Sequence, residues 1–303
     1  MTDNAWADFL RARPHISEAN FWLPSTSSGF RALATGEPFL FKTHWPDNRL
    51  VGGGFFSGFA QLSIDEAWDI FGEGNGVPSL DALASAIAGY RKEAPDPKTR
   101  IGCVLLRDLF FASEGEALPA PADFSKNIVR FKGYDLAQDT FLERHFRMLL
   151  GSARSRAAEP DGETLSVAGD TRGLPSLKVP RLGQQAFKSL VLTVYQRRCA
   201  ITGNKVEPVL QAAHIRPIAE DGQHRVDNGL LLRSDVHILF DRGYLGVDDR
   251  HRLQVSPRLR SDFGNGEEFY SRAGQVIAIP ERRADRPSRD SVLWHMDTKF
   301  LAG

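Results

Sequence analysis

The sequence predicts an α+β protein of two domains, and three observations lead to this fold class. First, a chain of 303 residues is long enough for two domains that each bury a core. Second, strand-like apolar segments and capped helices interleave over the first half of the chain. Third, residues 151–180 are small and polar and show no periodicity, which is typical of a linker. We therefore expect a first domain at 1–150, a linker at 151–180 and a second domain at 181–303.

Three strands are predicted in the first domain. The segments 36–45, 49–62 and 101–111 are apolar, rich in aromatic residues and bounded by Gly, Pro or Asn. Interleaved with helices, they indicate a small module built round a curved sheet or barrel. We expect a group of its phenylalanines to form the core: Phe39, Phe41, Phe55, Phe56 and Phe59.

Helices are predicted from their caps and from apolar residues at helical spacing. Ser63 and Glu66 have the spacing of a capping box at the start of 63–73. Ser79 is a candidate N-cap for a helix over 80–93. In the second domain, 181–198 fits a helix with an apolar stripe. It is followed by a turn, a short strand that ends at His214, a polar loop and the apolar segment 229–244.

The charge of the chain is balanced overall and uneven in distribution. The formal net charge is zero, which argues against a highly basic nucleic-acid coat protein. Residues 1–150 hold 15 Lys and Arg against 19 Asp and Glu, a net charge of −4, so the other half carries +4. Basic residues are concentrated over 181–260, with 13 Lys and Arg against 8 Asp and Glu. This excess favours a phosphate-binding surface there.

The composition predicts a cytoplasmic protein without a membrane segment. Hydrophobic residues make up 42% and charged residues 25% of the chain, no run of 18 apolar residues occurs, and the N-terminus lacks the pattern of a signal peptide. The two cysteines, Cys103 and Cys199, cannot form a four-cysteine zinc knuckle or a disulfide framework. We expect both to be reduced, buried thiols.

A histidine–asparagine–histidine pattern is the strongest indication of chemistry. His214 closes a predicted strand. Asn228 follows 14 residues after His214, and His237 follows 9 residues after Asn228. Hydrolysis of a phosphodiester needs a base that activates water and a cation that neutralises the phosphate. Histidine suits the first role because its ordinary pKa lies near neutrality. The alternative is that His214 has only a structural role at the end of a buried strand.

The sequence around these residues resembles that of the HNH (ββα-metal) endonucleases, specifically the subfamily found in many bacterial restriction-type enzymes. The matching blocks are CAITG, LQAAHIRP and DNGLLLRSDVHILFDRGYL, and the resemblance covers about residues 181–290. It implies that His214 is the general base and that Asn228 braces the loop and orients the His214 ring through a hydrogen bond. It also implies that His237 binds a divalent metal, which would be Mg²⁺, Mn²⁺ or another transition metal.

The remaining metal ligands are open at this point. Asp241 lies one helical turn after His237, so its carboxylate projects from the same face and is a candidate second ligand. Asp235 competes with it, although it could instead cap the helix. Many HNH enzymes carry Asp or His directly before the base, whereas this chain has Ala213. Several nearby arginines are candidate phosphate contacts: Arg197, Arg198, Arg216, Arg233 and Arg242.

The first domain resembles the PUA-like superfamily, which includes EVE, ASCH, YTH and SRA domains. The shared pattern is an aromatic residue in a loop, Gly-Glu before an apolar strand, a charged turn and a glycine-rich strand. Such domains commonly hold a nucleic-acid base, often a modified one, in an aromatic pocket. The resemblance gives six candidate pocket residues: Phe21, Trp22, Ser25, Lys42, His44 and Trp45. Trp22 could equally belong to the core.

Three functions fit these observations. The first is a modification-dependent restriction endonuclease that cuts modified or foreign double-stranded DNA. The second is a nuclease effector of a defence system whose first domain senses a small ligand or a partner. The third, a nucleic-acid-binding protein with a decayed nuclease fold, is disfavoured because His214, Asn228 and His237 are all present. Cleavage of both strands with one site per chain would favour a homodimer.

Overall fold

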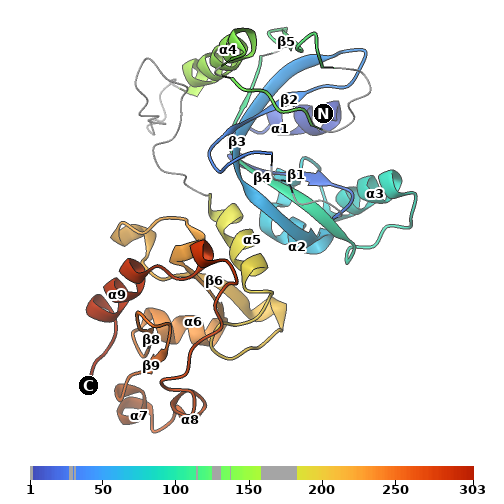
Figure 1. Cartoon of the computed structure of the whole chain (residues 1–303). Coiled ribbons are helices and arrows are strands. Elements are labelled where there is room, and N and C mark those ends of the chain that lie inside the picture. The colour runs from blue at the N-terminus through green and yellow to red at the C-terminus, as the bar shows by residue number, and fades with distance from the viewer. Residues whose placement is uncertain are drawn as a thin grey trace. The chain divides into compact units, whose positions relative to one another are not determined.

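The computed structural model describes residues 3–26, 30, 32–113, 115–124, 131–136, 138–157 and 183–303. The chain divides into two compact units, Met1–Arg181 and Leu182–Gly303 (Figure 1). The predicted linker begins inside helix α4 (Thr140–Ala157), and its residues from 158 onward lie outside the described ranges. Across those ranges no helix combines the length and apolar character needed to cross a membrane.

The first unit contains an antiparallel sheet of five strands. The strands are β1 (Glu18–Leu23), β2 (Pro38–Lys42), β3 (Arg49–Ser63), β4 (Arg100–Phe111) and β5 (Leu118–Pro119). Their order is β1-β4-β3-β2, and β5 pairs with the start of β3. Strands β2, β3 and β4 confirm the three predicted segments. The segment predicted as an aromatic loop is instead strand β1, in which Phe21 pairs with Val104 and Trp22 with Cys103.

Helices of the first unit begin at the caps that the sequence indicates. Helix α2 (Ile64–Phe71) has the capping box, with the Ser63 amide donating to the Glu66 carboxylate at 2.6 Å. Helix α3 (Leu80–Arg91) starts after Ser79, whose hydroxyl accepts from the Ala82 amide at 3.1 Å. The unit also contains helix α1 (Asn4–Arg11), the 3₁₀ turn η1 (Gly72–Asn75) and α4.

Phenylalanine side chains fill the core of the first unit. Phe39, Phe41, Phe55 and Phe56 are buried as predicted, and the fifth, Phe59, is partly buried against the same core. The glycine run in β3 lets the strands approach closely. A Cβ on Gly53 would lie 2.5 Å from the Phe110 ring and 2.8 Å from the Phe39 carbonyl oxygen. A glycine is therefore required at position 53, where β3 pairs with both β2 and β4.

The second unit is built round two antiparallel hairpins. Strand β6 (Leu210–His214) pairs with β7 (Gly229–Arg233), and β8 (Leu245–Val247) pairs with β9 (Leu253–Val255). Helix α6 (Ser234–Asp241) follows β7 directly. Three helices follow the second hairpin, in a part of the chain for which the sequence predicted no elements: α7 (Arg258–Phe263), α8 (Glu267–Tyr270) and α9 (Arg289–Thr298).

Helix α5 (Gln184–Val194) is shorter than its predicted range and supports the first hairpin by packing. A Cβ on Gly229 would lie 2.8 Å from Val191 and 2.9 Å from Phe187, so α5 lies directly on β7. The Tyr195 hydroxyl, just beyond the helix, donates to the Gly229 carbonyl at 3.2 Å. Both cysteines are free and buried, as predicted. Packing by α5 thus braces a hairpin that has no zinc knuckle.

Candidate active site

Strands β6 and β7 and helix α6 form a strand–strand–helix unit, and His214 lies at the end of its first strand. His214 pairs with Gly229, the first residue of β7. A cavity of about 360 Å³ opens beside it. The residues that line the cavity come from β6, the loop after it, α6 and α9: Ala212, His214, Ile215, Pro217, Ile218, His237, Asp241, His295 and Lys299. Two of the three motif residues, His214 and His237, therefore line the same cavity as Asp241.

The His214 ring is held by two aromatic neighbours. It stacks on Phe187 of α5, with ring centroids 4.1 Å apart and planes 9° apart. Its Nε2 lies 3.1 Å from Nδ1 of His224, a loop histidine that the sequence analysis did not single out. Burial, together with the charges of His224 and His237, lowers the pKa of His214 to about 4. At neutral pH the ring is therefore uncharged and able to accept a proton.

Asn228 is 4% exposed and bonds to the loop backbone rather than to the His214 ring. Its Oδ1 accepts from the Arg216 amide at 2.9 Å. Its Nδ2 donates to the carbonyls of Arg216 at 2.9 Å and Gln223 at 3.0 Å. The expected bracing of the loop is present, whereas the expected hydrogen bond to His214 is replaced by the contacts of Phe187 and His224.

His237 and Asp241 face each other on α6. His237 Nε2 lies 3.3 Å from the Asp241 carboxylate, and His237 Nδ1 lies 2.8 Å from Gln211 Oε1. An amide oxygen can only accept, so Nδ1 carries a hydrogen, and Nε2 is the ring nitrogen that faces Asp241. Desolvation raises the pKa of the Asp241 carboxyl, and the charges of His237 and Lys299 oppose this shift.

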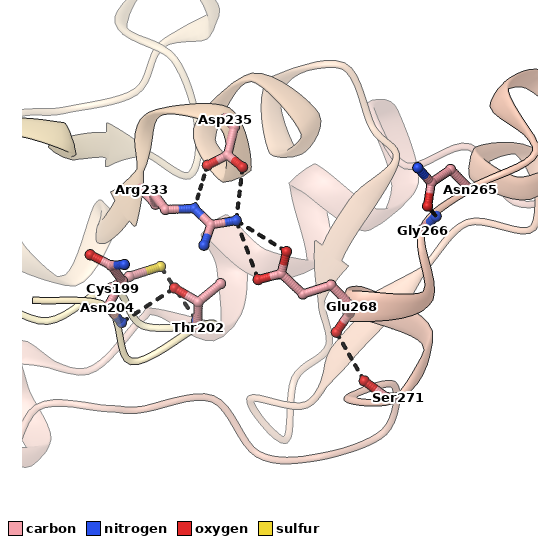
Figure 2. A network of polar contacts seen from close by, with 9 residues as sticks. All are labelled: Cys199, Thr202, Asn204, Arg233, Asp235, Asn265, Gly266, Glu268 and Ser271. Atoms are coloured by element: carbon pink, nitrogen blue, oxygen red, sulfur yellow. Dashed lines mark hydrogen bonds and ion pairs between the residues drawn. The ribbon is translucent and has the colours of Figure 1, made fainter. Parts of the chain in front are cut away.

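Asp235 does not line the cavity, because its carboxylate is engaged elsewhere. Figure 2 shows it in a two-point contact with Arg233, with distances of 2.6 and 2.8 Å. Arg233 also reaches Glu268 of α8 at 3.2 Å. This arginine is thereby neutralised by two carboxylates, which disfavours it as a phosphate contact. Of the two aspartates that are candidate metal ligands in the sequence, Asp241 lines the cavity and Asp235 does not.

The cavity fits a hydrated divalent cation. In the described ranges no group of three His, Cys, Asp or Glu side chains is placed so that it could hold a metal ion. Mg²⁺ nevertheless retains several waters and needs only one or two protein ligands. His237 Nε2 and the Asp241 carboxylate supply two suitable donors. A third polar atom, Nδ1 of His295, is buried at this cavity without a hydrogen-bonding partner in the described part of the chain.

Two further cavity residues, which the sequence pattern did not single out, are His295 of helix α9 and Lys299 directly after its end. Lys299 is partly exposed, and its ammonium lies 3.9 Å from the Glu220 carboxylate. The available signal was the capped helix that begins after Ser288, with His295 and Lys299 four residues apart on one face. Ala213, by contrast, is fully buried and does not line the cavity.

A larger cavity, of about 710 Å³, lies in the first unit. Its aromatic lining residues are Phe30, Phe39, Phe124, Phe131, Tyr134 and Phe146, and its charged ones include Glu37, Lys42 and Asp135. Of the six residues predicted for a base pocket, Lys42 alone is among those lining this cavity.

The other five predicted pocket residues lie elsewhere in the first unit. Phe21 belongs to the core, and Trp22 is held by a 3.1 Å hydrogen bond from its Nε1 to the Asn75 carbonyl. Trp45 is 60% exposed, and its neighbour His44 is also exposed. Ser25 is partly buried and does not line the cavity.

Comparison with known proteins identifies the second unit. Residues 199–248 match the family model of the HNH endonucleases, and this range contains His214, Asn228, His237 and Asp241. No curated protein matches the chain. Among solved structures, a modification-dependent TagI restriction endonuclease aligns with 93% of this chain and 75% of its own, at 15% identity and a TM-score of 0.30. A likeness of that size does not establish a shared fold. The chain thus contains an HNH endonuclease domain at residues 199–248 and is a nuclease enzyme.

Proposed function

We propose that the protein is a metal-dependent DNA endonuclease that cuts modified or foreign double-stranded DNA, in the manner of a modification-dependent restriction enzyme. The observation that carries the proposal is the convergence of His214, His237 and Asp241 on one cavity beside the β6–β7–α6 unit. A base and two metal-ligand types there are the groups that phosphodiester hydrolysis needs. Cleavage of both strands by one HNH site per chain favours the action of two copies of the chain.

The polar residues at and beside the cavity have roles that follow from their chemistry. His214 is uncharged at neutral pH and takes the proton from the attacking water. His237 and Asp241 hold the divalent cation, which supplies charge neutralisation at the phosphate when bound. Lys299, at the edge of the same cavity, adds a positive charge toward the phosphate. Asn228 keeps the loop between the two strands in place.

Removing a cation ligand should raise the metal concentration that cleavage requires. We expect His237→Ala and Asp241→Ala each to raise the Mg²⁺ or Mn²⁺ concentration for half-maximal rate by about tenfold or more. Asp235→Ala is the matched control, because its carboxylate pairs with Arg233 instead of lining the cavity. The measurement is a metal titration of DNA cleavage by each variant. Equal shifts for Asp235→Ala and Asp241→Ala would remove Asp241 from the ligand set.

Selection of modified DNA is assigned to the first unit. Its 710 Å³ cavity is large enough for a nucleobase, and aromatic rings with a few polar groups are suited to stacking on a base and reading its edge. Lys42 lies within it, 4.7 Å from the centre of the Phe124 ring, and burial lowers the pKa of its amine. Support for this assignment comes from the cavity itself and from the resemblance of this unit to PUA-like domains.

The cavity predicts which substitutions abolish the preference for modified DNA. Because stacking contributes about 1–3 kcal/mol per base, Phe124→Ala should lower affinity for the modified duplex by about 5–150-fold. Lys42→Met should reduce the preference while keeping the side-chain volume. Trp45→Ala is the control, since Trp45 is exposed and outside the cavity. Binding of modified and plain duplexes by the full chain is compared, with the melting temperature of each variant.

Two outcomes would redirect this assignment. Suppose that Trp22→Ala or Trp45→Ala loses the preference for modified DNA while the cavity variants keep it. The base pocket would then be formed by the residues predicted from the sequence and not by the cavity. A folded protein that treats every modified DNA like plain DNA would favour the alternative function. In that case the first unit senses a small ligand or a partner and controls the nuclease.

A further inference from the structure

His295 of α9 is almost completely buried, and it lines the nuclease cavity. Its ring stacks on Phe240 of α6, with centroids 3.8 Å apart and planes 13° apart. Its Nε2 lies 3.0 Å from the Phe240 carbonyl oxygen. Because a carbonyl only accepts, Nε2 must carry the ring hydrogen, and Nδ1 must then be a lone-pair acceptor.

The acceptor Nδ1 is the unexplained atom of this ring. It is buried and has no hydrogen-bonding partner in the described part of the chain. Burial lowers the pKa of His295 to about 4, and the charge of Lys299 acts in the same direction. The ring is therefore neutral at neutral pH and keeps the acceptor.

A purely structural role accounts for the ring and leaves Nδ1 unexplained. The Phe240 carbonyl already accepts a backbone hydrogen bond from the Gly243 amide at 3.0 Å, so it does not depend on His295 for a partner. The stacked contact with Phe240 could be made equally well by a phenylalanine at position 295. The stacking and the Nε2 hydrogen bond together account for one face and one nitrogen of the ring, and neither contact uses Nδ1.

The arrangement of His295 matches that of histidines at metal sites, which usually donate one ring N–H to a carbonyl and turn the other nitrogen toward the ion. The groups that share its cavity include His237, Asp241 and Lys299. Among the described residues, His295, His237 and Asp241 do not make up a group of three that could bind a metal ion directly. A hydrated Mg²⁺ or Mn²⁺ keeps several waters, however, and their hydrogens point outward to acceptors that are not themselves ligands.

We propose that His295 is a positioning residue of the cation site, whose Nδ1 accepts a hydrogen bond from a water bound to the divalent cation that His237 and Asp241 hold. This inference rests on the proposed metal-dependent function. It assigns to α9, which lies outside the matched range 199–248, a part in cation binding.

The test measures Mn²⁺ binding to the full chain without DNA, by the electron paramagnetic resonance signal of free Mn²⁺. His295→Gln retains a terminal N–H for Phe240, and His295→Phe retains the stacked ring. Both should weaken Mn²⁺ binding by about 10–100-fold, the usual effect of losing an outer partner of a metal site. His251→Gln is the matched control, because His251 Nε2 also bonds a carbonyl, that of Pro287 at 3.0 Å, and does not line the cavity.

A second measurement uses the unmodified protein and does not depend on the variants folding. Addition of Mg²⁺ should shift the ¹⁵N resonance of His295 Nδ1 and leave that of His251 unchanged, and His237→Ala should abolish the shift. The role of His295 would be overturned if folded His295→Gln and His295→Phe bound Mn²⁺ with the affinity of the unmodified chain, or if Mg²⁺ left the His295 resonance unmoved. Either result would leave the proposed metal dependence standing. An unmodified chain that binds no Mn²⁺ would overturn the proposed metal dependence together with the role of His295.

Discussion

His214→Ala is expected to lower the cleavage rate by about 10²–10⁴-fold, which corresponds to about 3–5 kcal/mol of activation free energy. The reason is that His214 is an uncharged histidine that lines the cavity at the end of β6, with its ring held by stacking on Phe187 and by the contact of Nε2 with His224. Single-turnover cleavage of DNA at saturating Mg²⁺ measures the chemical step. The melting temperature is recorded alongside, because the variant also loses the stacked contact with Phe187.

Two further variants separate catalysis from structure. His214→Phe retains a ring that can stack on Phe187, so it should fold like the unmodified protein and still fail to cut. His251→Ala is the histidine control away from the cavity and should cut at the normal rate. If His214→Phe cleaved DNA as fast as the unmodified chain, His214 would have only a structural role.

The pH dependence of cleavage provides an independent check on His214. A general base must be unprotonated to act, so its contribution to kcat/KM falls as the pH drops through its pKa in the free enzyme. Burial places that pKa at about 4, below the ordinary value of 6.5. We therefore expect no loss of kcat/KM attributable to His214 between pH 8 and 5, and a loss near pH 4. An acidic limb near pH 6.5 would mean that the base is a more exposed histidine.

The sequence predicts those parts of the site whose residues lie close together in the chain. The strand that ends at His214, the loop and the helix that carries His237 all lie between Leu210 and Asp241, and their spacing reflects the local geometry of a hairpin and one helix. The same holds for α2 and α3, whose caps are set by residues three apart. Local patterns of this kind are visible without any tertiary contact.

Long-range packing decides what the sequence pattern does not show. His295 lies 81 residues after His214, and only the docking of α9 against α6 brings it to the cavity. Pairing of β1 with β4 buries Phe21 in the core, which turns a predicted pocket residue into a packing residue. His224 lies in a polar loop without periodicity, where its contact with His214 depends on the path of that loop.

Asn228→Ala is expected to destabilise the second unit and to reduce cleavage by about 10²-fold through misplacement of the site. Its side chain joins both ends of the loop, since it contacts the Arg216 amide and carbonyl and the Gln223 carbonyl. Gln223 immediately precedes His224, the partner of the His214 ring. An unpaired buried group costs about 1–3 kcal/mol, so we expect a loss of about 2–4 kcal/mol in the free energy of unfolding.

Asn228→Asp tests the directions of those hydrogen bonds at nearly constant shape. A carboxylate can accept from the Arg216 amide, but it cannot donate to the two carbonyls that the Nδ2 group now contacts. Ionisation of the new carboxyl is thus disfavoured in the folded protein and its pKa is raised, so the deficit in stability should be largest at neutral pH. Protonation restores one donor, and the gap to the unmodified chain should narrow as the pH falls from 7 to 5. Denaturant unfolding at each pH measures the gap, with Asn265→Ala as the control because that exposed side chain makes one local contact. A gap that stays constant with pH would show that Asn228 is not a donor to the loop, and the bracing role would then fail.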